Sequence, residues 1–433
     1  MDLTSRAWLI FILVFLTLGT ILFYTSEVKR DSYSDHTRSY VSNSREPSST
    51  SDDLRIDVLS IVGAKIQGID KVPTKKMVET KRDANWKKNI LQYFSNQGCT
   101  VAPSDFRPPS WLEQMVILIG VQKGGTKALF SFLQEHPSVV SRCSDDARKT
   151  EIFFFDNRTL MYDQIDQQEL QIQYSKHVQN KCPLAVSALE EDSSKIFLDD
   201  SPGYMLESHQ VPKLLDCVLP SSKIIALIRD PTARAFSHYN FYVNRNLCTE
   251  FTFEEWVDMN IQDLKDAGIM DATDPYEELL AWRRYNDDPM HRKLRNCNSF
   301  VTRGLYAIEL LHYMTALIAS GRPKSDLHVI ISENLRGDTR QDEYNSLLQF
   351  LGLESHEILH NGDVHATDYE TTMKESTRVK LDQFFRPYNA RLYRMMGWNP
   401  IWNADSSKKC RALLEEYSLQ NIKIVTLCLQ KKK

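Results

Sequence analysis

Short apolar runs separated by polar, turn-forming stretches fill the middle of the chain. The runs at residues 115–119 (MVILI), 223–228 (KIIALI) and 327–331 (LHVII) are apolar almost throughout rather than at alternate positions. Such continuous runs are typical of strands buried on both faces of a parallel sheet. Residues 195–199 (KIFLD) indicate a further strand, which ends at a proline turn, and residues 139–140 a short one.

Helical patterns lie between these strands. Leu129, Phe132 and Leu133 share one helix face directly after the first strand. Further helices are expected over residues 232–243, 343–351 and 378–396. Because strands alternate with helices, the sequence predicts an α/β fold with a central parallel sheet flanked by helices.

The first strand runs into a glycine-rich turn with two lysines, Lys123-Gly124-Gly125-Thr126-Lys127. Glycines let backbone N–H groups approach an anion, and the helix N-terminus that follows adds a favourable field, so this pattern predicts an anion cradle. A turn that only packs helix on strand is the alternative. The order Thr126-Lys127 reverses that of a nucleoside-triphosphate P-loop, whose hydroxyl residue binds magnesium. Lys123 supplies positive charge directly, so no metal is expected.

More polar residues fall where other predicted strands end, at residues 151–156, 199–201 and 229–237. Ligands of open α/β sheets bind beyond the carboxyl ends of the strands. Arg229 is a fixed cation suited to a phosphate, and Ser237, two helical turns later, can donate a hydroxyl to the same group. Two anion sites at neighbouring strand ends fit a nucleotide that carries phosphates at both its 5′ and its 3′ position.

The amino-terminal part of the chain differs from the rest. Residues 7–24 (AWLIFILVFLTLGTILFY) form an uncharged run of 18 residues, near the minimum for a membrane-spanning helix. A cleaved signal peptide is the alternative, but no small-x-small cleavage site follows, which favours an uncleaved anchor. Residues 25–53 are too poor in apolar residues to fold. We expect a tail at 1–6, the anchor at 7–24, a stem at 25–109, a catalytic domain at 110–404 and an appendage at 405–433.

Composition narrows the cellular context. The net charge of −4 argues against a general nucleic-acid binder. The eight cysteines contain no C-x-x-C pair, so zinc ligation is not expected, and their even number fits disulfides whose pairing stays open. Asn157-Arg158-Thr159 is a glycosylation sequon, usable only in the secretory pathway.

Taken together, these motifs resemble the PAPS-dependent sulfotransferases, in particular the Golgi enzymes that sulfate glycosaminoglycans, such as the heparan sulfate 3-O-sulfotransferases (PAPS is 3′-phosphoadenylyl sulfate). The resemblance spans about residues 112–400. It rests on residues 119–129 (IGVQKGGTKAL), 151–156 (EIFFFD), 228–237 (IRDPTARAFS), 304–306 (GLY) and 385–389 (FRPYN). It implies a P-loop-like sulfotransferase fold and transfer of a sulfuryl group from PAPS to a carbohydrate hydroxyl.

The resemblance also implies roles for matching residues. Lys123 is expected to stabilise negative charge on the oxygen between sulfate and phosphate, and Glu151 to accept the proton of the acceptor hydroxyl. Glu151 stands beside three phenylalanines, so we expect a raised basicity; an ordinary surface carboxylate is the alternative. The expected donor-binding residues are Lys123, Gly124, Gly125, Thr126 and Lys127 at the 5′ group, Arg229 and Ser237 at the 3′-phosphate, and Tyr306 near the base. A simple core residue is the alternative interpretation of Tyr306.

Contacts to the acceptor are less well defined by the pattern. Phe153 stands where the heparan-type enzymes have histidine, and Asp200 where they have lysine before the Ser-Pro turn. Arg283 and Arg284 open a basic stretch, residues 283–303, that can attract an anionic polysaccharide, with a solvated charged surface as the alternative. The candidate acceptor-binding residues are Asp156, Asp200, Arg283 and Arg284.

The family's usual plan is a single-pass type II Golgi membrane enzyme with a luminal catalytic domain. We therefore expect a glycan acceptor and a membrane as partners, and no nucleic acid. One alternative is a P-loop-type nucleotide kinase, which magnesium-dependent ATP turnover would support. Another is a non-catalytic glycan-binding membrane protein, which would not bind the product PAP (adenosine 3′,5′-bisphosphate).

Overall fold

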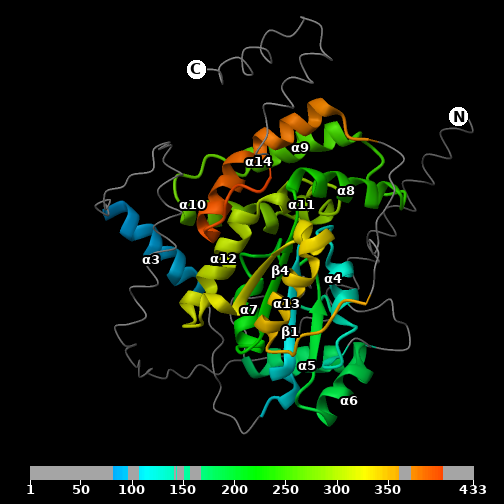
Figure 1. The fold of residues 1–433 in the computed structure, drawn as a ribbon. Coiled ribbons are helices and arrows are strands. Elements are labelled where there is room, and N and C mark those ends of the chain that lie inside the picture. Colours follow the sequence, from blue (N-terminus) through cyan, green and yellow to red (C-terminus); the bar gives the residue numbers. More distant parts are fainter. Residues whose placement is uncertain are drawn as a thin grey trace, which may run out of the picture. The chain divides into compact units, whose positions relative to one another are not determined.

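The computed structural model describes residues 81–95, 107–140, 143, 151–156, 167–359 and 372–402 (Figure 1). The expected tail at 1–6, the anchor at 7–24, the sequon at Asn157 and the appendage at 405–433 lie outside these residues. Among the helices that are described, none is long and apolar enough to cross a membrane.

Five parallel strands form the central sheet in the order β2-β3-β1-β4-β5. They are β1 (Met115–Gly120), β2 (Val139–Val140), β3 (Ile196–Asp200), β4 (Lys223–Ile228) and β5 (Leu327–Ile331). In the centre of the sheet β1 pairs with β3, with Leu118 beside Asp200, and with β4, with Ile117 beside Ile224. Every residue of β1 is buried, as its apolar sequence predicts. The predicted parallel sheet is confirmed.

Twelve α-helices accompany the sheet in the described part of the chain. They are α3 (Lys81–Ser95), α4 (Thr126–Leu133), α5 (Gln167–Lys181), α6 (Pro183–Glu191), α7 (Val211–Val218), α8 (Pro231–Val243), α9 (Phe253–Asp266), α10 (Pro275–Asp287), α11 (Pro289–Lys293), α12 (Tyr306–Ala319), α13 (Arg340–Leu351) and α14 (Glu375–Met396). The expected helices at 232–243, 343–351 and 378–396 correspond to α8, α13 and α14, each within a few residues.

Alternate residues of the strands enter two different cores. Ile117 and Ile119 pack with residues of α5, α7 and α12, whereas Val116 and Leu118 pack with α4 and α13. Burial of one such side chain stabilises the fold by about 1.5–3 kcal/mol. A third apolar cluster joins α8, α9, α10 and α14, and Figure 1 shows α8, α9 and α14 together above the sheet. Both faces of the sheet are therefore covered, and a helical layer adjoins one end of it.

Helix α3 packs into the same core as the sheet, although it precedes the boundary expected near residue 110. Trp86, Ile90 and Phe94 are buried in the core that contains Ile117. The Phe94 ring lies 6.0 Å from that of His312 in α12, and the Tyr93 hydroxyl donates to the carbonyl of His209, 3.2 Å away. Because these three apolar side chains share one helix face, α3 belongs to the folded domain rather than to a stem.

Disulfides are present, as the even cysteine count suggests. Cys143 is bonded to Cys182, and Cys248 to Cys297. Cys217 is disulfide-bonded as well. The first two bonds close segments of 39 and 49 residues, which restricts the unfolded chain and so stabilises the fold.

Candidate active site

The strand order places the topological switch point of the sheet between the carboxyl ends of β1 and β4. From β1 the chain continues to β2 and β3 on one side, whereas from β4 it continues to β5 on the other side. Adjacent parallel strands with diverging connections leave a ligand-binding crevice at their ends. Lys123 follows β1 and Arg229 follows β4, so both predicted anion-binding segments border this crevice. The Val121 N–H donates to the Leu227 carbonyl over 2.7 Å and joins the two strand ends.

Glycines are required at two positions of the loop after β1. A Cβ atom on Gly124 would lie 2.6 Å from the carbonyl oxygen of Leu227, so no side chain fits there. Gly125 has a φ of 105°, in the left-handed region that favours glycine, and directly precedes α4. The Ala128 N–H donates to the Gly125 carbonyl over 2.9 Å, whereas the N–H groups of the first two helical residues, Thr126 and Lys127, have no acceptor within the helix. The backbone of this segment therefore has the form of the predicted anion cradle.

Lys123 lies in a strongly positive environment. Its Nζ is 4.6 Å from the centroid of the Phe241 ring, and the Arg245 guanidinium lies 3.6 Å from the centroid of the same ring. Burial, followed by the charges of Arg245, Arg229 and Lys127, lowers the pKa of Lys123 to about 8. The charged groups that act on Lys123 are thus all cations, which an anion in the crevice would balance.

Helix α8 holds the cradle loop in place through residues that the sequence did not single out. Arg234 is buried and donates to the carbonyl of Gln122 over 3.3 Å. The Gln122 amide in turn donates to the Tyr242 hydroxyl, 3.3 Å away. Phe241 and Tyr242 follow Arg234 by seven and eight positions, so the three residues share one helix face. This spacing is the sequence signal that could have identified them as neighbours of the loop. Arg234 also donates to the carbonyl of Phe300.

Residues 151–156 form a loop whose backbone is tied to the end of β3. The Phe153 N–H donates to the Ser201 hydroxyl over 2.9 Å, and the Phe154 N–H to the Tyr204 hydroxyl over 3.0 Å. Both hydroxyls donate to the buried Asp199 carboxyl, over 2.5 and 3.1 Å. Asp199 thereby fixes the loop that carries Glu151 beside the sheet.

Burial and nearby charges set the basicity of Glu151. Burial raises the pKa of Glu151, whereas the charges of Lys127 and Lys181 lower it, and that of Asp156 raises it. Lys127 belongs to the cradle, so Glu151 lies within electrostatic reach of the anion site. Phe154 and Phe155 are buried, whereas Phe153 is 39% exposed. The Lys181 ammonium lies over the Phe153 ring, 5.3 Å from the ring centroid.

The second strand end is built by α8 and α12. Asp230 caps α8 by accepting from the N–H groups of Thr232 and Ala233, over 3.0 and 3.5 Å. Arg229 is half-buried and Ser237 is buried on α8. Tyr306 is buried as well, and its hydroxyl donates to the carbonyl of Arg229 over 2.8 Å. In this structure Tyr306 positions the strand end that carries Arg229.

Asp156 and Asp200, two candidate acceptor residues, lie near the same strand ends. The Asp156 carboxyl packs so closely on Gly203 that a Cβ atom there would be 2.6 Å from it. Burial raises the pKa of Asp156, and the charge of Arg295 lowers it. Asp200 ends β3 and is buried.

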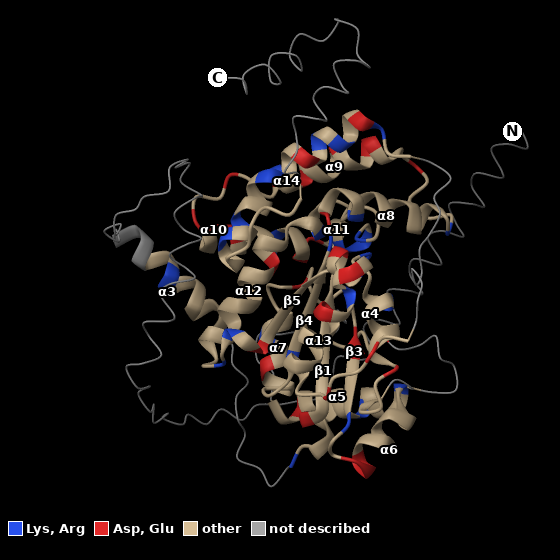
Figure 2. Cartoon of the chain, viewed as in Figure 1, with Lys and Arg blue, Asp and Glu red and all other residues tan. Residues whose placement is uncertain are grey.

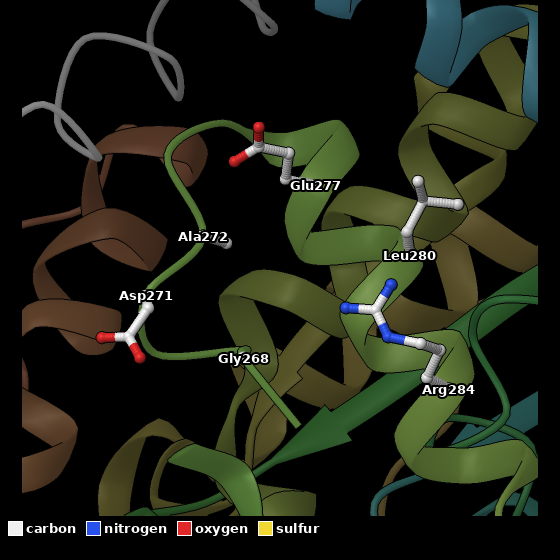
Figure 3. A pocket seen from close by; sticks show the side chains of 6 residues that line it. All are labelled: Gly268, Asp271, Ala272, Glu277, Leu280 and Arg284. Carbon is white, nitrogen blue, oxygen red and sulfur yellow. The ribbon is translucent and has the colours of Figure 1, made fainter. Parts of the chain in front are cut away.

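Arg283 and Arg284 lie on α10 and make different contacts. Arg283 forms an ion pair with Asp287 at 3.3 Å. Arg284 borders a pocket of about 220 Å³ (Figure 3). The pocket is lined by Gly268, Asp271, Ala272, Glu277, Leu280 and Arg284.

Other cations of the basic stretch also have acidic partners. Arg292 pairs with Asp287 at 2.6 Å and Arg295 with Glu207 at 2.6 Å, whereas Arg303 is buried. Figure 2 shows basic and acidic residues interleaved around α10 and α11. These contacts agree with the alternative interpretation of residues 283–303 as a charged face that largely compensates itself.

No group of three or more His, Cys, Asp or Glu side chains is placed to hold a metal ion within the ranges that the structure describes. The positive charge around the crevice comes instead from the lysines and arginines named above.

The chain is similar in sequence to known sulfotransferases. The family model for the sulfotransferase domain matches residues 113–385. The heparan sulfate glucosamine 3-O-sulfotransferase 5 of Mus musculus is 25% identical over 304 residues, which cover 66% of this chain and 73% of the relative. The heparan sulfate glucosamine 3-O-sulfotransferase 3B1 of Homo sapiens is 23% identical over 338 residues, which cover 72% of this chain and 68% of the relative. A solved sulfotransferase from Alicyclobacillus acidocaldarius superimposes with a TM-score of 0.43 at 20% identity, covering 68% of this chain and 97% of that one.

Proposed function

This chain belongs to the sulfotransferase domain family, and we propose that it transfers a sulfuryl group from PAPS to a hydroxyl of a glycosaminoglycan or other glycan. The observation that carries the proposal is the position of Lys123 and Arg229. They follow adjacent strands, and the charge of Arg229 is strong enough at Lys123 to lower its pKa. One molecule with two phosphate groups can therefore contact both. The heparan sulfate enzymes among the relatives support a glycan acceptor.

The chain's own residues fit the donor. The left-handed Gly125 and the first turn of α4 would supply backbone N–H groups for the 5′ phosphosulfate, and Gly124 allows the loop to pack closely on the end of β4. Lys123 and Lys127 supply positive charge for the same group. Arg229 and Ser237 would hold the 3′-phosphate, because a guanidinium and a hydroxyl suit phosphate oxygens.

The proposed reaction uses Glu151 and Lys123. The acceptor oxygen attacks sulfur while its proton passes to the Glu151 carboxylate, whose pKa burial raises. The bond between sulfur and the bridging oxygen breaks, and its electron pair stays on the 5′-phosphate. Lys123, which is charged at neutral pH because its pKa is about 8, stabilises that negative charge. The products are the sulfated glycan and PAP.

The cellular setting is proposed from the chain's other features. The disulfides Cys143–Cys182 and Cys248–Cys297 fit an oxidising compartment. With an uncleaved anchor at residues 7–24, the enzyme would be a type II Golgi membrane protein with a luminal catalytic domain, glycosylated at Asn157. The packing of α3 supports a catalytic domain that begins before residue 110.

The two-ended donor site can be tested by binding experiments on the Arg229→Ala variant. We expect its affinity for PAP to fall by about 10–100-fold, because a charge-assisted hydrogen bond to the 3′-phosphate contributes about 1.5–3 kcal/mol. Its affinity for 5′-AMP, which has no 3′-phosphate, should not change. Calorimetric titration with both nucleotides measures this difference. An equal loss for both would contradict a 3′-phosphate site at Arg229.

The activity itself is tested by incubating the protein with sulfate-labelled PAPS and a panel of glycans, heparan sulfate included. Transfer of label to a glycan supports the proposal and identifies the acceptor class. Magnesium-dependent ATP turnover would favour a nucleotide kinase instead. Failure to bind PAP would favour a non-catalytic glycan-binding protein.

A further inference from the structure

Asp200 occupies an unusual position at the donor site. It is the last residue of β3 and pairs in register with Leu118 of β1, the strand that leads into the cradle. Only 1% of its surface is exposed. Thr126, in the first turn of α4, hydrogen-bonds its side chain, whereas its Oδ1 atom has no hydrogen-bond partner among the described residues.

The charges around Asp200 are unfavourable for an ionised carboxylate. The charges of two acidic groups, Glu151 and Asp199, act on it, and Lys127 is the cation that acts on it. A buried carboxylate with an unpaired oxygen is costly, and two more carboxyl groups nearby add to the cost. Burial, then the charges of Glu151 and Asp199, raises the pKa of Asp200 to about 8. At neutral pH most of the population therefore carries the proton.

We propose that Asp200 is a positioning residue that forms the floor of the donor site as a neutral acid, hydrogen-bonded to Thr126 and within electrostatic reach of Glu151. The inference rests on the proposed function, because it assumes that the cradle binds the 5′ group of PAPS. In the neutral form Asp200 orients Thr126 without placing negative charge below the phosphosulfate. It also leaves Glu151 as the ionised member of the two carboxyl groups, since two adjacent carboxylates resist joint ionisation.

The state of Asp200 couples donor binding to pH. As the pH rises through about 8, Asp200 loses its proton, and its charge then repels an anion in the cradle and competes for Lys127. Lys123 loses its proton in the same range, so donor binding should weaken in the wild type for two reasons. Asparagine has the shape of the neutral acid but cannot ionise. The Asp200→Asn variant therefore removes one of the two reasons and leaves the other.

Binding of PAP to the wild type and to Asp200→Asn, measured by calorimetry, tests the proposal. At about pH 6 we expect affinities equal within about threefold, because the carboxyl group is neutral in the wild type. At about pH 9 we expect the variant to bind PAP about tenfold more tightly, because it lacks the ionised charge near the phosphate. A constant affinity ratio at both pH values would overturn the proposal. Failure of the variant to fold at the lower pH would overturn it as well, since asparagine replaces a neutral acid there.

Denaturant unfolding without ligand provides a readout that does not depend on donor binding. A folded-state pKa raised from 3.8 to about 8 contributes stability at low pH, and this stability is lost as the pH rises to about 8. The wild type should therefore lose stability relative to Asp200→Asn between about pH 5 and pH 9. A parallel pH dependence for the two proteins would contradict a neutral Asp200.

Asp216→Asn is the matched control. Asp216 lies on α7, pairs with Arg322 at 3.8 Å, and burial also raises its pKa. Its substitution should alter the pH dependence of unfolding but not the PAP affinity ratio between the two pH values. The experiments separate the two hypotheses. Absence of PAP binding to either protein at low pH would refute the proposed function, whereas PAP binding with a constant ratio would refute only the role of Asp200.

Discussion

Two regions of this molecule are rich in basic side chains, but their charges are balanced in different ways. Around the cradle, the groups that shift the pKa of Lys123 are the cations Arg245, Arg229 and Lys127. In the stretch 283–303, Arg292 and Arg295 each form an ion pair with a carboxylate at 2.6 Å. The first region keeps a positive potential that an anion can satisfy, whereas the charge of the second is largely compensated by the protein's own acids.

The backbone explains much of this difference. Lys123 and Arg229 follow the ends of two adjacent parallel strands, where the glycines allow close backbone approach. The cations at 283–303 lie on and after helix α10, whose last residue, Asp287, contacts two arginines. A count of basic residues therefore does not identify an anion site, because nearby acids decide whether the charge is available to a ligand.

Of the substitutions considered, we expect Lys123→Ala to reduce turnover the most. Replacing the lysine by alanine should lower turnover by a factor of about 10²–10³, because the group that stabilises the leaving oxygen is lost. The fold should remain intact by circular dichroism. Lys265→Ala, which removes an exposed lysine of α9, serves as the control. Near-normal turnover of Lys123→Ala would show that the cradle is not the reaction centre.

A smaller loss is expected for Glu151→Gln. Its kcat should fall by about 10² or more, because proton transfer to a positioned base is lost. The affinity for PAP should change little, since the uncharged amide leaves the cradle cations in place. Turnover assays and calorimetry measure the two quantities. Equal losses in kcat and in PAP affinity would indicate that Glu151 has a structural role instead.

A moderate effect is expected for Phe241→Leu. The ring supports Lys123 from α8, and a cation–π contact contributes about 0.5–2 kcal/mol. We expect kcat/KM to fall by about 3–30-fold. Phe236→Leu, on the same helix but packed on Phe253 at 5.2 Å, is the matched control. A similar loss in both variants would attribute the effect to helix packing.

The smallest effect is expected for Asp287→Asn, which removes a carboxylate that pairs with arginines of the stretch 283–303. Burial raises the pKa of Asp287, but the hydrogen bond and charge of His209 and the charge of Arg292 lower it more. The resulting pKa is about 2. A carboxyl group whose pKa is lower in the folded state stabilises the fold at pH values above its ordinary pKa. This stability is lost as the pH falls towards 2. Because Asp287 is about one-third exposed, Asp287→Asn should cost only about 1 kcal/mol at neutral pH.

Urea unfolding at neutral and acid pH measures this cost and its pH dependence. The variant should lose the acid-dependent part of its stability, while its affinity for PAP should not change. A marked change in PAP affinity would show that the stretch 283–303 contributes to the donor site after all, and the contrast between the two regions would fail.

Much of the sheet and part of the candidate site can be predicted from the sequence, because the relevant patterns are local. Continuous apolar runs predict β1 and β4, and the glycines and lysines of the cradle follow β1 without interruption. Because parallel strands that alternate with helices place their carboxyl ends at one edge, Lys123 and Arg229 could be expected to share that edge.

Only the tertiary structure decided which groups surround those residues. Phe241 lies 118 positions after Lys123, and Asp200 meets Thr126 across two paired strands. Helix α3 has a polar sequence overall, and its three core residues become evident only where α12 covers them. Burial and charge balance depend on neighbours that are distant along the chain, so a local pattern can indicate which side chains share a helix face but not which groups they contact. The residue types are therefore set by the sequence, whereas the protonation of Asp200 and the availability of the cations are set by packing.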